Sequence, residues 1–262
     1  MEQDLNIART YFKQIDGLTA RNLLNDANLT LHRDGNIQVC YSPFDHIERS
    51  ARLVIVGITP GMTQAVNALN ALNNAKLAGK SINEALRTAK MTASFSGAMR
   101  SNLVEMLDFI GVARLLKLKT TASLFETGSR DMHFTSALRY PVFVDGKNYS
   151  GNPYMLKVAA LRSMVETHLA EEARLLSDAI WLPLGPKAEE AVLHLAGKGL
   201  LPRMNILAGM PHPSGANAER IAVFTGRKPP EHASAKTDAE KLLRSAAKLK
   251  NQISGLKLGE AA

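Results

Sequence analysis

The segment LVIVGITPG, residues 53–61, is the strongest indication of fold in this 262-residue chain. Its first four residues form a continuous apolar run rich in β-branched side chains, which is typical of a strand buried on both faces of a sheet. The run leads directly into Gly57 and Gly61, which allow the backbone to approach a ligand closely. Open α/β sheets bind ligands beyond the carboxyl ends of their strands, so this turn is an expected ligand site. A tight strand-to-helix turn without a ligand is the alternative.

Similar apolar segments recur along the chain and alternate with helical patterns. The sequence predicts further strands at residues 133–141, 179–184 and 204–208, a hairpin at 29–41 and a loop at 142–153. Apolar residues at helical spacing predict helices, and the segments with this spacing are 4–24, 64–86, 103–110, 158–176, 187–194 and 239–253. Residues 222–224 fit either a short strand or a helical turn. This alternation predicts one α/β domain with a parallel central sheet.

The composition limits the class of protein and its partners. A hydrophobic content of 45% is typical of a globular protein with a sizeable core, and a net charge of +8 favours a polyanionic partner. The single cysteine, Cys40, excludes an intramolecular disulfide framework and any site of four cysteines. The sequence shows no secretory signal pattern and no apolar run long enough to span a membrane. We expect a cytoplasmic monomer with no membrane contact, no metal and no cofactor.

A second candidate site is GMPHPSGAN, residues 209–217. Pro211 and Pro213 fix the backbone on both sides of His212, so this side chain is expected to be held in place. Ser214, Gly215 and Asn217 follow with backbone amides and short polar side chains that can form an anion-binding concavity. The segment therefore predicts a phosphate-binding loop, and a proline-rich turn with an incidental histidine is the alternative.

Two shorter segments complete the set of candidates. Phe95 precedes a glycine-containing turn and the next helix, where an aromatic ring can stack on a base or simply cover the core. Ser136 and Arg139 stand at the end of the strand predicted at residues 133–141.

Taken together, these motifs resemble the uracil-DNA glycosylase superfamily over residues 52–225. GITPG (57–61) looks like its first motif, FSGAMR (95–100) resembles its base-stacking segment, and HPSGAN (212–217) looks like the last motif, which inserts into DNA. TSALRYP (135–141) and PLGPKAEEAV (183–192) resemble two segments of the thermostable bacterial branch. The resemblance implies a single three-layer α/β/α sandwich with a central, mostly parallel sheet. It spans residues 1–225, with residues 1–50 as a helix and hairpin packed on it and residues 226–262 as a basic helical tail.

The resemblance also implies an activity: the protein binds DNA, flips out a damaged base, uracil or a related deaminated base, and hydrolyses its N-glycosidic bond without a metal. His212 would stabilise negative charge developing on the base. Thr59 takes the position where relatives carry Asp or Asn to orient water, and Ser136 the position where an Asn reads the uracil edge. The other expected base- and DNA-binding residues are Gly57, Ile58, Pro60, Gly61, Phe95, Arg139, Ser214, Gly215 and Asn217.

Two further interpretations stay open from the sequence. A protein that keeps the phosphate-binding loops but lacks a water-activating residue would be a DNA-binding or damage-sensing module without catalysis. A carboxylate recruited from elsewhere, such as Asp131 or Asp145, would restore the hydrolytic interpretation. A nucleotide or phosphate-sugar hydrolase is the remaining alternative, although the sequence has no metal-ligand or Ser-His-Asp spacing that would support it.

Overall fold

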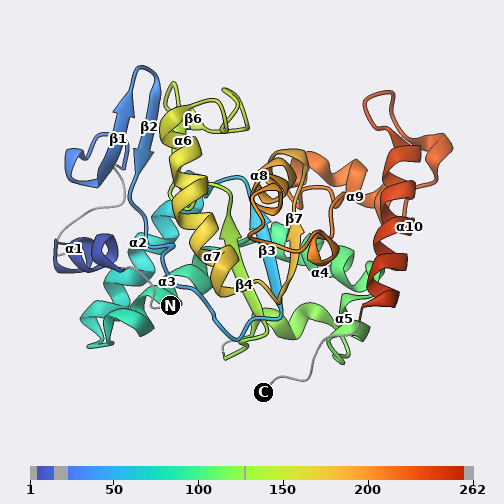
Figure 1. Cartoon of the computed structure of the whole chain (residues 1–262), viewed down its shortest axis with the longest axis horizontal. Helices are drawn as coiled ribbons and strands as arrows, with labels where there is room; N and C mark the ends of the chain where they lie inside the picture. Colours follow the sequence, from blue (N-terminus) through green and yellow to red (C-terminus); the bar gives the residue numbers. More distant parts are fainter. Residues whose placement is uncertain (1–4, 15–22, 127, 257–262) are drawn as a thin grey trace. The chain divides into compact units, whose positions relative to one another are not determined.

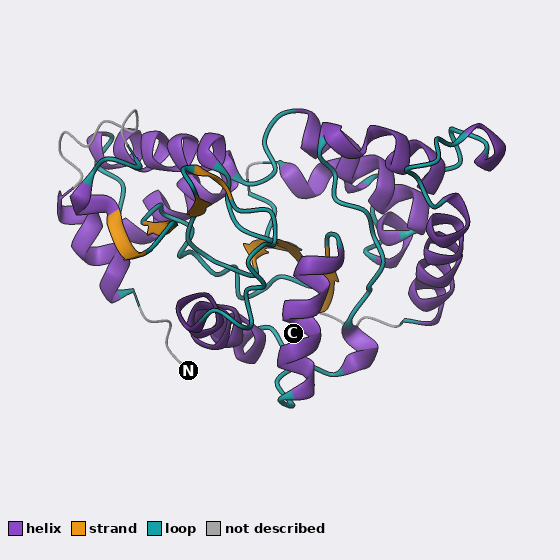
Figure 2. Ribbon diagram, turned by 90° about the horizontal axis from the view of Figure 1, so that it is seen from above, coloured by secondary structure: helices purple, strands orange, loops and turns teal. Residues whose placement is uncertain are grey.

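The computed structural model describes residues 5–14, 23–126 and 128–256 (Figure 1). The chain divides into two compact units. Unit 1 comprises Met1–Arg49, Gly57–Ser94 and Phe134–Ser177, and unit 2 comprises Ser50–Val56, Phe95–His133 and Asp178–Ala262. Helix predominates over strand in the described part of the chain, as Figure 2 shows. Each unit is described by itself below.

Unit 1 contains an antiparallel sheet in the strand order β1-β2-β5-β6. Its strands are β1 (Thr30–Asp34), β2 (Ile37–Cys40), β5 (Val142–Val144) and β6 (Lys147–Asn148). The pairing of β1 with β2 confirms the predicted hairpin. The prediction of a loop at 142–153 was wrong at its start, because Asp145 and Gly146 take the positive φ angles of 51° and 72° that join β5 to β6 in a tight turn.

The helices of unit 1 differ from the sequence prediction mainly in their breaks. They are α1 (Asn6–Gln14), α2 (Met62–Leu77), α3 (Ile82–Ala93), α6 (Ala159–Met164), a π-helical turn (Val165–Leu169) and α7 (Ala170–Leu175), with a 3-10 turn at Ala27–Leu29. The single helix predicted at 64–86 is two helices, because Gly79 adopts a φ of 71° and Ser81 starts α3 with a capping box to Glu84. Part of the helix predicted at 4–24 lies outside the described residues.

A cluster of buried charges holds the interior of unit 1 together. The guanidinium of Arg139, 3% exposed, donates to Oε1 of the fully buried Glu172 at 2.9 Å from Nη2 and 3.1 Å from Nε. The ammonium of Lys90 lies 4.0 Å from the same oxygen, and burial lowers the pKa of Lys90 to about 8. The hydroxyl of Tyr140 donates to Asp45 at 2.6 Å, and desolvation raises the pKa of that buried carboxyl. Each buried charge in the cluster therefore depends on its neighbours.

We predict that Glu172→Gln lowers the free energy of unfolding of unit 1 by about 3–5 kcal/mol, because it leaves two buried cations undercompensated. Urea-induced unfolding measures this loss. Glu171→Gln is the matched control: its carboxylate also pairs with Arg139 but is 15% exposed, so the expected loss is under about 1 kcal/mol. Equal losses in the two variants would contradict the prediction.

The strands β3 (Leu53–Gly57), β4 (Met132–Ser136) and β7 (Ile180–Pro183) form a second sheet, in the order β4-β3-β7. Within unit 2, β3 pairs in parallel with β7, and isolated parallel bridges join Trp181 to Ile206 and Leu184 to Met210. The apolar run of β3 is completely buried, as its sequence predicts. The strand predicted at 204–208 is only partly confirmed, because residues 203–205 form a 3-10 turn before the extended segment begins.

The helices of unit 2 are α4 (Ala98–Ile110), α5 (Val112–Leu115), α8 (Pro186–Gly197), α9 (Ala218–Phe224) and α10 (Ala239–Gly255), with 3-10 turns at Thr121–Phe125, Arg203–Asn205, Gly215–Asn217 and Pro230–His232. Of the two alternatives for 222–224, the helical one is confirmed. Helix α10 packs against α9, α4 and α5 through the buried side chains of Ala246, Leu249 and Ile253. The segment expected to be a tail thus contributes to the core of unit 2. Among the described residues, no helix has both the length and the apolar character needed to cross a membrane.

Candidate functional site

The GITPG segment leaves β3 inside unit 1 and continues beside residues 137–142. The carbonyl of Gly57 accepts a hydrogen bond from Ala137 N at 2.8 Å, and the carbonyl of Ile58 accepts one from Leu138 N at 2.9 Å. These bonds extend backbone pairing past the end of the strand, so the carbonyls of Gly57 and Ile58 already have protein partners.

Thr59 fixes the same segment with its side chain. Its hydroxyl donates to the carbonyl of Tyr140 at 3.0 Å and accepts from the amide of Val142 at 3.1 Å. A threonine hydroxyl has one proton to donate and two acceptor lone pairs. The proton is therefore committed to Tyr140, and a water molecule at Thr59 can only donate to the remaining lone pair.

Pro60 and Gly61 lead into α2, whose first amides also have partners. Gly61 N donates to Gln64 Oε1 at 3.2 Å, and Met62 N donates to Asn148 Oδ1 at 2.9 Å. A Cβ at Gly61 would lie 2.9 Å from Gln64 Oε1 and 3.1 Å from Asn148 Nδ2. A side chain at Gly61 would therefore have to displace the flexible end of Gln64 and shift the Asn148 amide by a few tenths of an ångström. A phosphate at this helix end would have to displace Gln64 or Asn148.

The other candidates of unit 1 have separate environments. Ser136 is half-buried at the end of β4. Arg139 is buried, and its ion pairs with Glu171 and Glu172 engage the guanidinium, so we assign Arg139 to the core of unit 1 instead of a DNA-binding surface. Asp145 accepts a hydrogen bond from Asn36 Nδ2 at 3.1 Å between the tips of two hairpins. The carboxylate of Asp145 therefore connects the two hairpins of unit 1.

The other carboxylate considered for water activation, Asp131, belongs to unit 2. It forms an ion pair at 2.9 Å with Arg52, which immediately precedes β3. Asp131 therefore lies at the amino end of β3, whereas ligands of open α/β sheets bind at the carboxyl ends.

Phe95, also in unit 2, has an unusual backbone conformation. Its φ is 48°, in the left-handed region that bulky side chains rarely adopt, and Gly97 two residues later has a φ of 71° before α4 begins. Holding a residue in this conformation costs free energy, and such strained residues are concentrated at functional sites. The half-buried ring is compatible with the predicted stacking role and with a role in covering the core.

The best-defined candidate in unit 2 is His212. Its Nδ1 accepts a hydrogen bond from Ser214 N at 3.2 Å, which places the ring proton of the neutral imidazole on Nε2. Burial lowers the pKa of His212 from its usual value of 6.5, so the ring is neutral at pH 7. His212 is therefore a fixed, neutral hydrogen-bond donor.

The remaining residues of the loop form a short hydrogen-bonded turn. Asn217 Nδ2 donates to Ser214 Oγ at 3.1 Å, and Arg220 Nη1 donates to Asn217 Oδ1 at 3.0 Å. Gly215 is exposed at the start of this turn.

Asn102 on α4 is a contact that the sequence did not predict. Its Nδ2 donates to the carbonyl of Pro213 at 2.8 Å, so it anchors the residue that follows His212. The two residues are 111 positions apart in the chain, and no local sequence pattern connects them.

His212 lines a cavity of about 390 Å³ inside unit 2, between the start of α8, the 209–217 loop and the first half of α10. We call it the His212 cavity. Its charged lining residues are Glu189, Arg220, Lys236, Asp238 and Lys241. A volume of this size is in the range that holds a small organic ligand such as a nucleoside.

Glu219 on α9 anchors the segment of residues 228–237, which contributes Lys236 to the lining of this cavity. Its carboxylate accepts from Lys228 Nζ at 2.5 Å, from Thr237 Oγ1 at 2.6 Å and from the amide and hydroxyl of Ser234. These hydrogen bonds, that of Lys228 foremost, hold the pKa of Glu219 well below its usual range. They fix residues 228–237 on α9 and so place Lys236 at the rim of the cavity.

The structure thus brings the candidates together as two groups. Unit 1 contains Gly57, Ile58, Thr59, Pro60, Gly61, Ser136 and Arg139, and unit 2 contains Phe95, His212, Ser214, Gly215 and Asn217. Among the described residues, no three His, Cys, Asp or Glu side chains are arranged to bind a metal ion.

We predict that Thr59→Val lowers the free energy of unfolding by about 1–3 kcal/mol, because the carbonyl of Tyr140 and the amide of Val142 both lose a partner. Urea-induced unfolding gives the measurement. Thr59→Ser keeps the hydroxyl and is expected to retain most of the stability. A Thr59→Val variant as stable as wild type would show that the hydroxyl has no structural role.

Comparisons with known proteins identify a relative in Bacillus subtilis. No protein-family model matches the chain, and no solved structure matches it. The uncharacterized protein YoxB of Bacillus subtilis (strain 168) is 36% identical over 214 residues, which cover 80% of this chain and 83% of YoxB. Identity at this level across most of both chains shows that the two proteins belong to one family.

Proposed function

The chain belongs to the family of the Bacillus subtilis protein YoxB, and we propose that it is a DNA glycosylase. It binds DNA, takes a uracil or related deaminated base out of the helix, and hydrolyses the bond between the base and the sugar. The proposal includes a three-layer α/β/α sandwich with a mostly parallel central sheet. The parallel pairing of β3 with β7 and the parallel bridges at Ile206 and Met210 support that architecture.

The observation that carries the proposal is the fixed neutral imidazole of His212. When the glycosidic bond breaks, its electron pair moves onto the base, and charge develops on the base oxygen. A donor that already points at this oxygen stabilises the charge without reorganising. The Ser214 amide sets the Nε2–H tautomer, and Asn102 and the two flanking prolines restrict movement of the loop.

The charged groups around the His212 cavity fit a nucleotide in DNA. Arg220, Lys236 and Lys241 are exposed cations at its lining, where they can contact the phosphates on either side of an extruded nucleotide. Extrusion costs a few kcal/mol, which such phosphate contacts offset.

Hydrolysis also requires a group that accepts a proton from the attacking water. Water attacks the sugar carbon C1′, and the C1′–N bond breaks as the nucleobase leaves with the electron pair. The proton of the attacking water passes to a proton-accepting side chain. Glu189, on the first turn of α8, is a carboxylate of the His212 cavity. We assign it the role of proton acceptor, in place of Thr59, whose hydroxyl proton is committed to Tyr140.

A second candidate function is DNA binding without catalysis. The hydrogen bonds of Thr59 favour it, because the residue at the water-orienting position serves to hold the backbone. The two functions differ in whether an abasic site is ever formed.

The test is incubation of the protein with oligonucleotides that carry uracil, hypoxanthine, xanthine or a T/G mismatch, followed by alkaline cleavage of abasic sites. We expect excision of at least one deaminated base, and a loss of about a hundred- to a thousandfold in rate for His212→Ala. Glu189→Gln should lose at least about a hundredfold. Its control, Glu190→Gln, removes a carboxylate that pairs with Lys187 on the same helix but does not line the cavity, and it should excise normally. Binding without excision in wild type would establish the second function.

The excision rate should also report the protonation of His212. Because burial lowers the pKa of His212, the neutral imidazole, which accepts from the Ser214 amide at Nδ1 and donates from Nε2, is the main form at pH 6.5 and above. The rate should stay level from about pH 8 to 6.5 and fall at lower pH, where protonation of Nδ1 breaks the bond to Ser214 N that holds the ring. A rate that rises as the pH falls toward about 5 would mean that the imidazolium is the active form. The His212→Ala variant should lack this dependence.

A further inference from the structure

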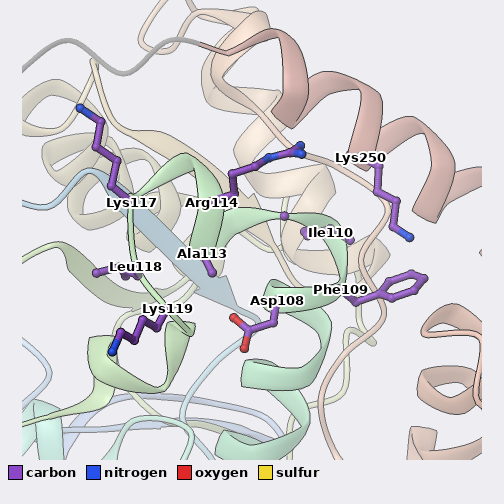
Figure 3. Close-up of a pocket in the computed structure, with 10 residues that line it drawn as sticks. Asp108, Phe109, Ile110, Ala113, Arg114, Lys117, Leu118, Lys119 and Lys250 are labelled. Atoms are coloured by element: carbon purple, nitrogen blue, oxygen red, sulfur yellow. The ribbon is translucent and has the colours of Figure 1, made fainter.

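A second hollow in unit 2 lies where α4 ends and α5 begins, and none of the residues that the proposed activity uses lines it. Its volume is about 710 Å³, and Figure 3 shows the side chains that line it. The charged members are Arg114, Lys117, Lys119, Lys250 and Asp108. We call this feature the α5 hollow.

The local backbone spreads the cations around the hollow. Gly111, with a φ of 95°, is both the residue that caps the end of α4 and the residue before α5, and Lys117, with a φ of 58°, lies in the turn after α5. Figure 3 shows Lys117 and Lys119 extending on one side and Arg114 and Lys250 on the other. The buried side chains of α4 and α5 beneath them give these cations a rigid base.

Four cations and one carboxylate line the α5 hollow, so its lining keeps a net positive charge. The one carboxylate present, Asp108, accepts from Thr120 Oγ1 at 2.5 Å and from Thr121 N at 2.7 Å. None of the four cations has a carboxylate partner among the described residues. Lys250 instead lies 3.4 Å from the ring centroid of Phe109, a cation–π contact that holds its ammonium in place.

Three cations on neighbouring elements do have carboxylate partners. Arg227 pairs with Glu105, Lys228 pairs with Glu219, and Arg244 pairs with Glu240. Four cations without a carboxylate partner in the described part of the chain therefore concentrate charge around one concavity, and the field of such a concavity attracts anions.

We propose that the α5 hollow binds the sugar-phosphate backbone of a nucleic acid. The four cations extend in different directions, so a single phosphate cannot reach all of them, whereas successive phosphates of an extended polyanion can. A membrane surface fits less well: the large hydrophobic side chains exposed on the described part of the chain, Ile7, Leu77, Met204 and Leu243, do not line this hollow.

This inference and the proposed function both concern binding to a nucleic acid. The α5 hollow takes no part in breaking the bond between the base and the sugar. The α5 hollow would lengthen the DNA contact beyond the His212 cavity, on a surface that no sequence motif indicated. It would bind undamaged DNA as well as damaged DNA, because phosphate contacts carry no information about the base.

The test compares two triple variants of equal net charge. Arg114→Gln/Lys119→Gln/Lys250→Gln removes three cations of the α5 hollow, and Lys147→Gln/Lys157→Gln/Arg162→Gln removes three exposed cations of unit 1. Binding to an undamaged 20-base-pair duplex is measured by fluorescence anisotropy between about 50 and 250 mM salt. The double variant Arg114→Gln/Lys119→Gln serves if removal of the Lys250 ammonium from the Phe109 ring prevents folding.

We expect the α5-hollow variant to bind about ten- to a hundredfold more weakly at 50 mM salt, and its plot of log affinity against log salt to flatten by about 0.9 for each phosphate that it no longer neutralises. The control should stay within about threefold of wild type. Equal losses of affinity in both variants, or no duplex binding by wild type at 50 mM salt, would overturn the inference. Loss of binding to phosphatidylserine vesicles with unchanged duplex binding would also overturn it. Undamaged duplex is used so that a failure of base excision leaves this result unaffected.

Discussion

The ion pair between Arg139 and Glu172 is the constraint on which unit 1 depends. Burying a charge is costly unless a partner compensates it, so this pair ties the segment after β4 to α7 and at the same time fixes Lys90 on α3. The segment after β4 also carries Tyr140, whose carbonyl receives the Thr59 hydroxyl. The same segment thus connects the buried ion pair of Arg139 to the hydrogen bond that holds Thr59 in the GITPG turn.

In unit 2, contacts between neutral groups, and not buried ion pairs, restrict the loop of residues 209–217 that carries His212. The two prolines limit the backbone around His212, the Ser214 amide sets the imidazole tautomer, and Asn102 anchors the carbonyl of Pro213. Neutral contacts suit a residue that must remain an uncharged donor, because a nearby cation or anion would shift its pKa. The charged residues line the same cavity, where they can contact a ligand, and burial is the cause of the lowered pKa of His212.

Much of the secondary structure could be predicted from the sequence, because local patterns carry it. The apolar run of β3, the hairpin of β1 and β2 and the amphipathic spacing of α10 all predicted the correct element. The errors were also local. The Asp145-Gly146 turn signal was interpreted as a loop, and the break between α2 and α3 was missed although Gly79 and the Ser81 capping box mark it.

Taken alone, the sequence establishes which residues are chemically suited to a site, since two prolines around a histidine or a glycine after a buried strand have consequences that need no partner. How those residues are used depends on tertiary packing. Arg139 lies in the core because its buried guanidinium pairs with Glu172, 33 positions later in the chain. Thr59 holds the backbone of residues 140–142 because folding places its hydroxyl beside them. Asn102 reached Pro213 across 111 positions. Such contacts join side chains that are distant in the chain, and a local pattern holds no information about which distant segments folding brings together.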